Sequence, residues 1–147
     1  MDRLKLVALD EEDLAIISAH CQDAVLKAAD ARYLPRERRF ILPMNRFVWE
    51  KPGGSGKYER RRAVLHFERV MKVSSTGFDR KRKDQVLSLL AVTFSETDKP
   101  AGHIEIVFSG GAAIRLEAEV IEAQLSDMNA AWETGSRPEH DEAEKLS

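Results

Sequence analysis

Residues 86–118 read VLSLLAVTFSETDKPAGHIEIVFSGGAAIRLEA, and most of this stretch alternates between apolar and polar residues. Three apolar runs are separated by two short breaks, at residues 97–102 and at Gly110 and Gly111. Successive side chains of a β-strand point to opposite faces, so a period of two predicts strands. Breaks this short cannot hold a crossover to a parallel neighbour. The stretch therefore predicts three antiparallel strands in a meander.

The same period extends toward the N-terminus. Residues 40–49 are apolar on both faces, which is typical of a central strand. Pro43 has no N–H to donate to a ladder, so it predicts a bulge or an edge at that point. Residues 63–70 predict another strand, with a bend near residues 68–69 where the alternation changes phase. Residues 4–9 predict a further short strand.

Two segments have helical spacing instead. Asp10 is a typical N-cap, and Leu14, Ile17 and Cys21 follow at i, i+3 and i+7, which predicts a helix over about residues 11–21. A second helix is predicted over residues 121–132. Its apolar stripe consists of Ile121, Leu125, Met128 and Trp132.

The expected fold class is α+β. We predict a curled antiparallel sheet of six or more strands, with one N-terminal helix and one C-terminal helix. A curled sheet with a C-terminal helix is also the arrangement of pleckstrin-homology-like barrels, which is a fold-level analogy that implies no function. Residues 1–133 are expected to form a single globular domain. Residues 134–147 lack a core-forming pattern and predict a disordered acidic tail.

Composition restricts the class of protein. The chain has 147 residues and a net charge of −2, which argues against a surface that is basic all over. No apolar run approaches the ~20 residues of a membrane-spanning helix, and we recognise no signal-peptide pattern. Cys21 is the single cysteine and cannot form an internal disulfide. We therefore expect a cytoplasmic protein that does not associate with membranes.

Several stretches resemble a family of short bacterial proteins, the domain-of-unknown-function family 2948. The resemblance covers about residues 4–132. It implies a bacterial cytosolic protein, and it carries no assigned activity and no catalytic residues that could be transferred to this chain. The stretches that carry it are residues 4–14, 33–40, 45–50, 114–117 and 121–123.

Charge is distributed unevenly along the chain. Residues 32–83 hold 16 Lys and Arg against 5 Asp and Glu, whereas residues 84–147 hold 4 against 13. One interpretation is a face that binds nucleic acid or another phosphate anion. The other is that basic strands pair with acidic strands of the same domain. The candidate anion-binding residues are Arg36, Arg38, Arg39, Arg60, Arg61, Arg62, Arg80, Lys81, Arg82 and Lys83.

A metal site is a third hypothesis. His66 and Glu68 are two residues apart, as are His103 and Glu105, so each pair would point to one face of its strand. If those strands paired in register, four metal-ligating side chains would converge. Cys21 is most simply a small buried apolar residue, and no residue pattern predicts a catalytic centre or a cofactor.

Three functions follow from these observations. The first is a non-catalytic interaction module, which binds a protein partner or a second copy of itself. The second is a nucleic-acid or phosphate-anion binder that uses the basic block, residues 32–83. The third is a small metal-dependent enzyme. The sequence favours the first, because it contains a well-patterned sheet without a convergent polar constellation.

Overall fold

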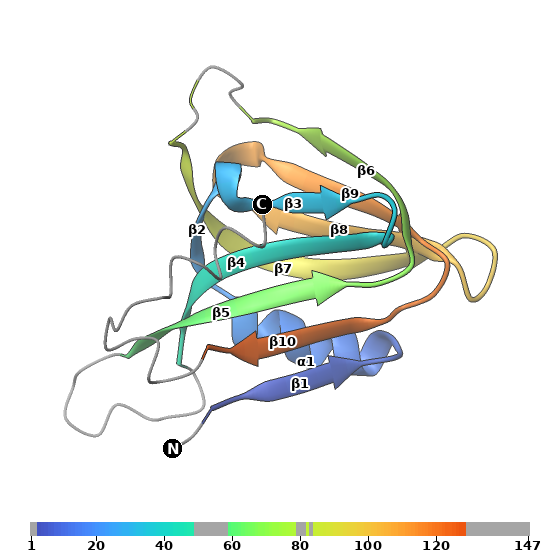
Figure 1. Cartoon of the computed structure of the whole chain (residues 1–147), viewed down its shortest axis with the longest axis horizontal. Coiled ribbons are helices and arrows are strands. Elements are labelled where there is room, and N and C mark those ends of the chain that lie inside the picture. Colours follow the sequence, from blue (N-terminus) through green and yellow to red (C-terminus); the bar gives the residue numbers. More distant parts are fainter. Residues whose placement is uncertain (1–2, 49–58, 79–81, 83, 129–147) are drawn as a thin grey trace.

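The computed structural model describes residues 3–48, 59–78, 82 and 84–128. Most of the described chain is antiparallel sheet, with a single α-helix (Figure 1). In chain order the elements are β1 (Lys5–Ala8), α1 (Glu11–Cys21), β2 (Val25–Lys27), the 3₁₀ turn η1 (Ala28–Asp30), β3 (Arg32–Leu34), β4 (Arg39–Phe47), β5 (Arg60–Phe67), β6 (Val70–Thr76), β7 (Val86–Glu96), β8 (Gly102–Phe108), the 3₁₀ turn η2 (Ser109–Gly111), β9 (Ala113–Ala118) and β10 (Ala123–Asp127).

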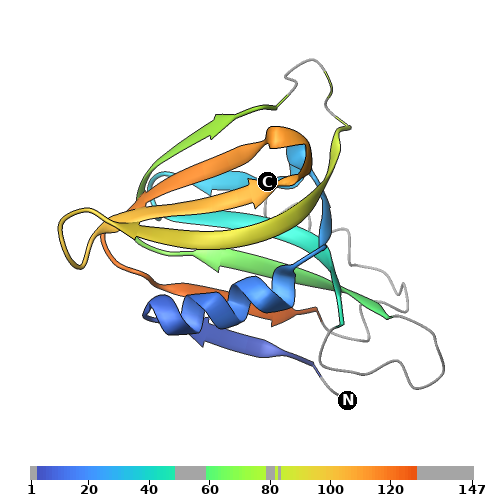
Figure 2. The same ribbon diagram turned by 180° about the vertical axis from the view of Figure 1, so that it is seen from behind.

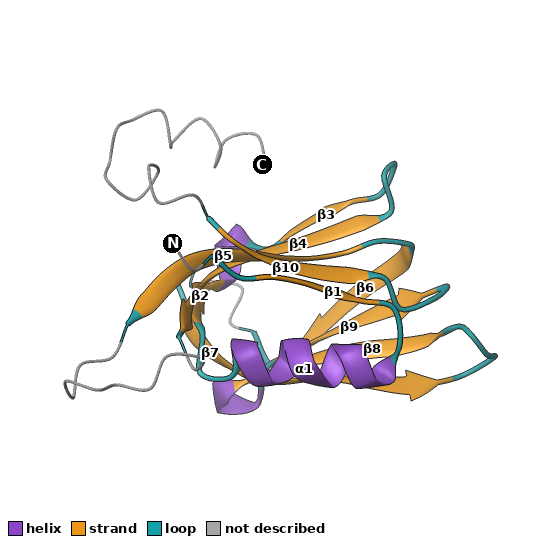
Figure 3. Cartoon of the chain, turned by 90° about the horizontal axis from the view of Figure 1, so that it is seen from below, coloured by secondary structure: helices purple, strands orange, loops and turns teal. Residues whose placement is uncertain are grey.

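The sheet follows one path of neighbours, β1-β10-β5-β4-β2-β7-β8-β9-β6, with β3 added on β4. The path does not close on itself. It curls so that two layers face each other, with β4, β5 and β10 in one layer and β7, β8 and β9 in the other (Figure 3). The predicted meander over residues 86–118 is confirmed as β7, β8 and β9, and the strands predicted over residues 4–9 and 40–49 are confirmed as β1 and β4. The strand predicted over residues 63–70 is β5 up to Phe67, and Val70 begins β6.

Two bent strand pairs connect the layers. β5 leads into β6 through residues 68–69, and β9 leads into β10 through residues 119–122. β10 pairs with β5, and β9 pairs with β6, so both bends lie at the same corner. Backbone hydrogen bonds from Glu68 to Glu122 and from Glu119 to Arg69 tie the corner together. The bend predicted near residues 68–69 is therefore confirmed, and Arg69 turns the chain there with a positive φ of 60°.

Helix α1 fills a gap in the curled sheet between β1 and β7 (Figure 2). Leu14, Ile17 and Cys21 face the core from the helix, as their spacing predicted. β2 pairs with β7 only at residues 86–88 of β7. Farther along β7, the Ser18 hydroxyl of α1 accepts the Val92 N–H at 2.9 Å. We call this gap the first seam, and α1 seals it from within the same chain.

Pro43 lies where the ladder permits a residue without an N–H. β4 pairs with β5 from Phe40 to Phe47, and Pro43 lies opposite Val64. On its other side β4 pairs with β3 up to Ile41 and with β2 at Asn45, so Pro43 falls between these two neighbours. Of the bulge or edge predicted at Pro43, the structure shows a local edge within a strand that is otherwise central.

The predicted C-terminal helix is wrong. Residues 123–127 form β10, which pairs with both β1 and β5. Ile121, Ala123, Leu125 and Asp127 are all buried, so the true period of this segment is two. Asp127 occupies the fourth inward position, so its charge interrupts the apolar alternation that would otherwise indicate a strand. The remainder of the predicted helix, residues 129–132, and the predicted tail lie outside the described residues.

Within the described residues, no helix has the length and apolar character that a membrane crossing needs.

Replacing Asp10 with alanine tests the cap of α1. The Asp10 carboxylate accepts the Asp13 N–H at 2.8 Å, which satisfies one of the amides left without a partner at the helix start. We expect Asp10→Ala to lower the free energy of unfolding by about 1 kcal/mol in urea titration. Asp10→Ser should restore most of the loss, and an equal loss in both variants would contradict a capping role.

Candidate functional site

The apolar core opens to the surface between β6 and the segment that contains η1 and β3. A slot of about 390 Å³ lies there. It is mostly apolar, and its lining comes from both sides of the gap. The lining residues are Ala28, Ala29, Ala31, Tyr33, Phe40, Val73, Ser75, Phe78, Arg82, Gln85 and Ile114.

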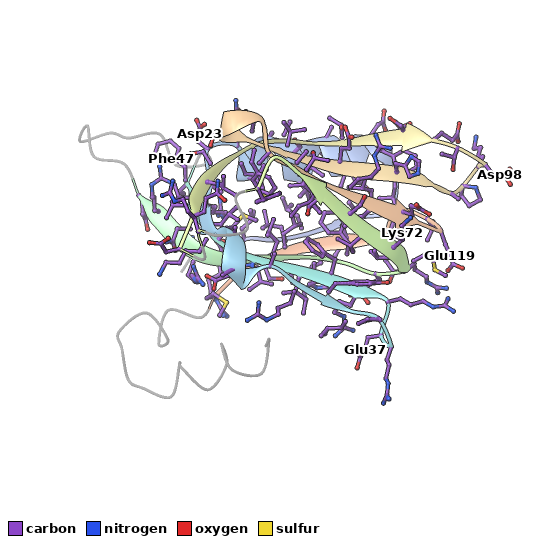
Figure 4. All side chains as sticks on the ribbon, turned by 90° about the horizontal axis from the view of Figure 1, so that it is seen from above. Asp23, Glu37, Phe47, Lys72, Asp98 and Glu119 are labelled. Atoms are coloured by element: carbon purple, nitrogen blue, oxygen red, sulfur yellow. The ribbon has the colours of Figure 1, made fainter. Side chains whose placement is uncertain are left out.

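The slot exists because two strand edges meet at one end and then diverge. At the meeting point the Tyr33 hydroxyl donates to the Val70 carbonyl at 2.8 Å, and the Val70 N–H donates to the Arg38 carbonyl at 2.9 Å. Beyond Val70, β6 and β3 separate, as Figures 1 and 4 show from two directions. We call this gap the second seam, and the slot lies in it.

Five side chains around the slot belong to the margin of the core. Ala28, Ala31, Tyr33, Val73 and Phe78 pack against the buried cluster but are only partly buried themselves. The Phe78 ring meets the buried Phe108 ring edge-on at 5.8 Å between centroids, which fixes one wall. The slot is therefore a place where the core is incompletely covered by the described residues.

The polar groups at the slot are few. Arg82 is exposed and lines it, together with Gln85 and Ser75. No carboxylate lines the slot among the residues that the structure describes. Arg82 is therefore the charged side chain that the described residues bring to the slot, and it favours an anionic group on a ligand there.

Among the described residues, the other candidate anion-binding side chains do not line this slot. Arg36, Arg38 and Arg39 lie at or beside the β3–β4 turn, and Arg60 and Arg62 lie at the start of β5. These positions are at opposite ends of the β4–β5 ladder, since Phe47 pairs with Arg60 and Phe40 with Phe67. Eight steps along β4 span about 26 Å. Figure 4 shows the two ends through Glu37 and Phe47.

Most of these arginines also have partners within the chain. Arg39 binds Glu68 at 2.9 Å, Arg38 lies 3.7 Å from Glu119, and Arg62 lies 3.9 Å from Asp30. Arg60 donates to the carbonyls of Asp23 and Asn45 and stacks over Phe47. The structure thus places basic strands beside carboxylates of the same domain. Arg80, Lys81 and Lys83 lie outside the described residues.

The two His-Glu pairs are not brought together. β5, which carries His66, pairs with β4 and β10, whereas β8, which carries His103, pairs with β7 and β9. His66 Nδ1 lies 2.8 Å from Glu68, and Glu105 instead binds Arg115 at 2.9 Å. Within the described residues, no three His, Cys, Asp or Glu side chains are arranged to hold a metal ion.

A family model for proteins of unknown function, DUF2948, matches residues 4–140. The chain belongs to the DUF2948 family. This confirms the resemblance stated above, and the match extends past residue 132. Searches among curated proteins and among solved structures found no match. The likeness to pleckstrin-homology-like barrels therefore stays a prediction.

The DUF2948 protein also contains a buried ionic cluster at the end of the sheet opposite the corner. The guanidinium of Arg46 binds the carboxylate of Asp127 in bidentate fashion, at 2.7 and 2.9 Å, and both side chains are fully buried. Asp127 also accepts the Leu4 N–H at 2.9 Å, and Arg61 lies 3.5 Å away. The cluster joins β4, β5 and β10 to the residue before β1.

The pKa of Asp127 follows from these contacts. Burial alone would raise it, but hydrogen bonds from Arg46, the Leu4 amide and Arg61, with the charge of Arg46, hold the pKa below its ordinary value of 3.8. Cys21 behaves in the opposite way. Burial raises the pKa of its thiol to about 12, while Arg46 lowers it and Asp127 raises it to smaller extents. The thiol is therefore protonated at neutral pH and is a poor nucleophile.

The sequence did not predict the slot. Of the residues in this cluster, it singled out Arg61 alone, as a candidate for anion binding. Arg46 has the same parity as Phe40, Leu42 and Met44, so an inward arginine was readable from the alternation. Arg61 has the parity of Leu65 and points inward, with a side chain only 10% exposed, so it is a cluster member and offers little surface to an anion. The slot has no comparable signal, because its walls come from segments about 40 residues apart that no local pattern links.

Proposed function

We propose that this DUF2948 protein is a cytoplasmic, non-catalytic interaction module that binds a segment of a partner protein in the slot. The observation that carries the proposal is the exposed margin of the core between two strand edges. An apolar cavity of a few hundred Å³ is the usual form of a binding pocket. The slot volume of about 390 Å³ lies in that range.

Insertion of an apolar side chain would cover core surface that the described residues leave partly exposed. Tyr33, Val73 and Phe78 would each lose contact with water when the slot is filled. Full burial of a Leu- or Phe-sized side chain stabilises by about 1.5–3 kcal/mol, before the costs of association. Such a gain supports a specific but modest affinity.

The first seam provides a comparison within the same molecule. There, α1 places three apolar side chains into the core and seals the gap between β1 and β7. At the second seam no described helix or strand occupies the space between β3 and β6. A partner segment in the slot would cover the exposed core margin at the second seam, as α1 covers the core at the first.

Nucleic-acid or phosphate binding through residues 32–83 stays a second hypothesis, supported by the excess of basic residues there. We rank it lower because Arg38, Arg39 and Arg62 lie beside carboxylates. It predicts an affinity that falls steeply with salt, whereas apolar insertion predicts weak salt dependence. The metal-dependent enzyme stays the third hypothesis.

The substitution Ser75→Trp tests the proposal. Peptides selected from a random displayed library on the full-length protein serve as the probe. Ser75 lines the slot from β6, so an indole at this position should occupy it. We expect peptide affinity, measured by calorimetry, to fall at least about tenfold, which corresponds to the loss of one buried apolar side chain.

Thr93→Trp is the control. Thr93 is an exposed residue of β7 and does not line the slot. Its variant should bind the selected peptides with unchanged affinity, and both variants should keep the circular dichroism spectrum of the parent. Equal affinity of the parent and of Ser75→Trp would overturn the proposed function.

A further inference from the structure

The free edge of β6 forms one border of the slot. β6 is the last strand of the sheet path and pairs with β9 on one side. Alternate residues of such an edge strand direct their N–H and C=O groups away from the paired neighbour. At Val70 both groups are used across the second seam, by the Arg38 carbonyl and the Tyr33 hydroxyl.

Past Val70 the edge is open toward the slot. Among the described residues, no backbone hydrogen bond outside the β6–β9 ladder involves residues 71–76. All the side chains of these residues except Val73 are exposed. An unpaired edge of six residues is long enough to accept an added strand, since strands of four to eight residues are common.

The direction of the β6 side chains connects this edge to the slot. Val73 and Ser75 line the slot, whereas Lys72 and Ser74 do not. A strand added to β6 would point alternate side chains to the same face as Val73 and Ser75, because side chains of paired strands share faces. Every second residue of the ligand would therefore face Tyr33 and Phe78 across the slot.

Charge further limits the ligand. Arg82 is exposed at the slot, and Lys72 is exposed on β6 (Figure 4), while the lining has no carboxylate among the described residues. An acidic side chain next to the inserted apolar residue would meet Arg82 without repulsion. An exposed pair of this kind contributes modestly to affinity and more to selectivity.

Building on the proposed function, we propose that the ligand is an extended, acidic segment of a partner protein that adds as a strand to the free edge of β6. The segment inserts one large apolar side chain among Tyr33, Val73 and Phe78. It places an adjacent Asp or Glu side chain against Arg82. Backbone hydrogen bonds to β6 hold it, and the slot and Arg82 select its sequence.

Backbone methylation of the selected peptides tests the added strand. Each peptide amide is N-methylated in turn, and the affinity for the full-length protein is measured. We expect losses of at least about fivefold at alternate positions and small changes between them, since only alternate amides of an added strand bond to β6. Those backbone amides of residues 71–76 that point away from β9 should also exchange hydrogen more slowly in the complex.

Charge reversal tests the selectivity. Arg82→Glu should weaken binding of the parent peptide about fivefold or more, and a peptide with Lys in place of its acidic residue should recover most of that loss. Glu119→Lys is the control, because Glu119 is exposed but does not line the slot. Circular dichroism confirms that each variant is folded.

The possible failures are distinguishable. Tolerance of methylation at every position, with sensitivity to Ser75→Trp retained, would overturn the added strand and leave the proposed function intact. Selection of peptides without acidic residues, or equal binding by Arg82→Glu, would overturn the role of charge. Failure to select any peptide, with medium-chain carboxylic acids bound in the slot instead, would overturn the inference and point to a small-molecule ligand.

Discussion

Replacing Asp127 with asparagine is expected to lower the free energy of unfolding by about 3–5 kcal/mol, because it leaves a buried arginine without its counter-charge. The side chains of Arg46 and Asp127 are both fully buried, and two short hydrogen bonds join them. The amide of asparagine has nearly the same volume, so the loss reports charge and hydrogen bonding and not a cavity. Urea titration followed by circular dichroism measures it.

Two further variants test whether the loss comes from the buried charge. Glu105→Gln breaks the exposed ion pair with Arg115 and should cost less than about 1 kcal/mol. Arg46→Met combined with Asp127→Leu should recover much of the stability lost in Asp127→Asn, since neither member of the pair is then left buried alone. A loss below about 1 kcal/mol in Asp127→Asn would contradict the assigned role of the pair.

The difference in free energy of unfolding between the parent and Asp127→Asn should depend on pH, and the pKa of Asp127 sets the direction. The pKa of Asp127 is lower in the folded protein than its ordinary value of 3.8, so the unfolded chain takes up the proton first as the pH falls. The stabilisation is present above pH 3.8 and is lost as the pH falls through the lower, folded pKa. The gap between the parent and Asp127→Asn should therefore be largest near neutral pH and should shrink in acid.

Replacing Phe67 with alanine should lower the free energy of unfolding by about 3–5 kcal/mol, through lost apolar burial and the cavity left behind. Phe67 is fully buried at the end of β5, just before the corner, and its ring lies 6.5 Å from that of Phe40. It pairs with Phe40 on one side and Ala123 on the other. Its loss therefore weakens the packing of three strands, and urea titration measures the effect.

Val7→Ala is the matched control for this second experiment. Val7 is an apolar strand residue of β1, but 53% of its surface is exposed. Truncating it should change the free energy of unfolding by no more than about 0.5 kcal/mol. If Val7→Ala and Phe67→Ala were equally destabilising, the core would not be where the structure places it.

Local patterns predicted the elements whose stability comes from neighbours in sequence. Asp10 caps α1 three residues from its partner, and the stripe of Leu14, Ile17 and Cys21 packs as its spacing requires. The alternation of residues 86–118 produced three hairpin strands because short breaks leave an antiparallel meander as the available arrangement. Pro43 marked the position where β4 has no second neighbour, because a missing N–H is a local property.

The incorrect helix shows where such patterns fail. The apolar residues Ile121, Leu125 and Met128 fit a helix by spacing, and Asp127 interrupts the apolar alternation of Ile121, Ala123 and Leu125. Asp127 is nevertheless buried, because Arg46 lies 81 residues away in sequence and neutralises it. A buried charge is tolerated only beside a partner, and for Asp127 that partner belongs to another strand.

The candidate site also depends on contacts between segments that are distant in the sequence. Composition identified the basic block, and the alternation predicted the strands β4 and β5 within it, but neither could say which arginines meet carboxylates. The sequence alone predicted the antiparallel sheet, helix α1 and most of the strands correctly, since these depend on periodicity within a few residues. The tertiary structure alone decided the order of the strands, the buried Arg46–Asp127 pair and the slot between β3 and β6. These depend on which distant segments pair, and the free energy of such pairing is spread over contacts that no local stretch contains.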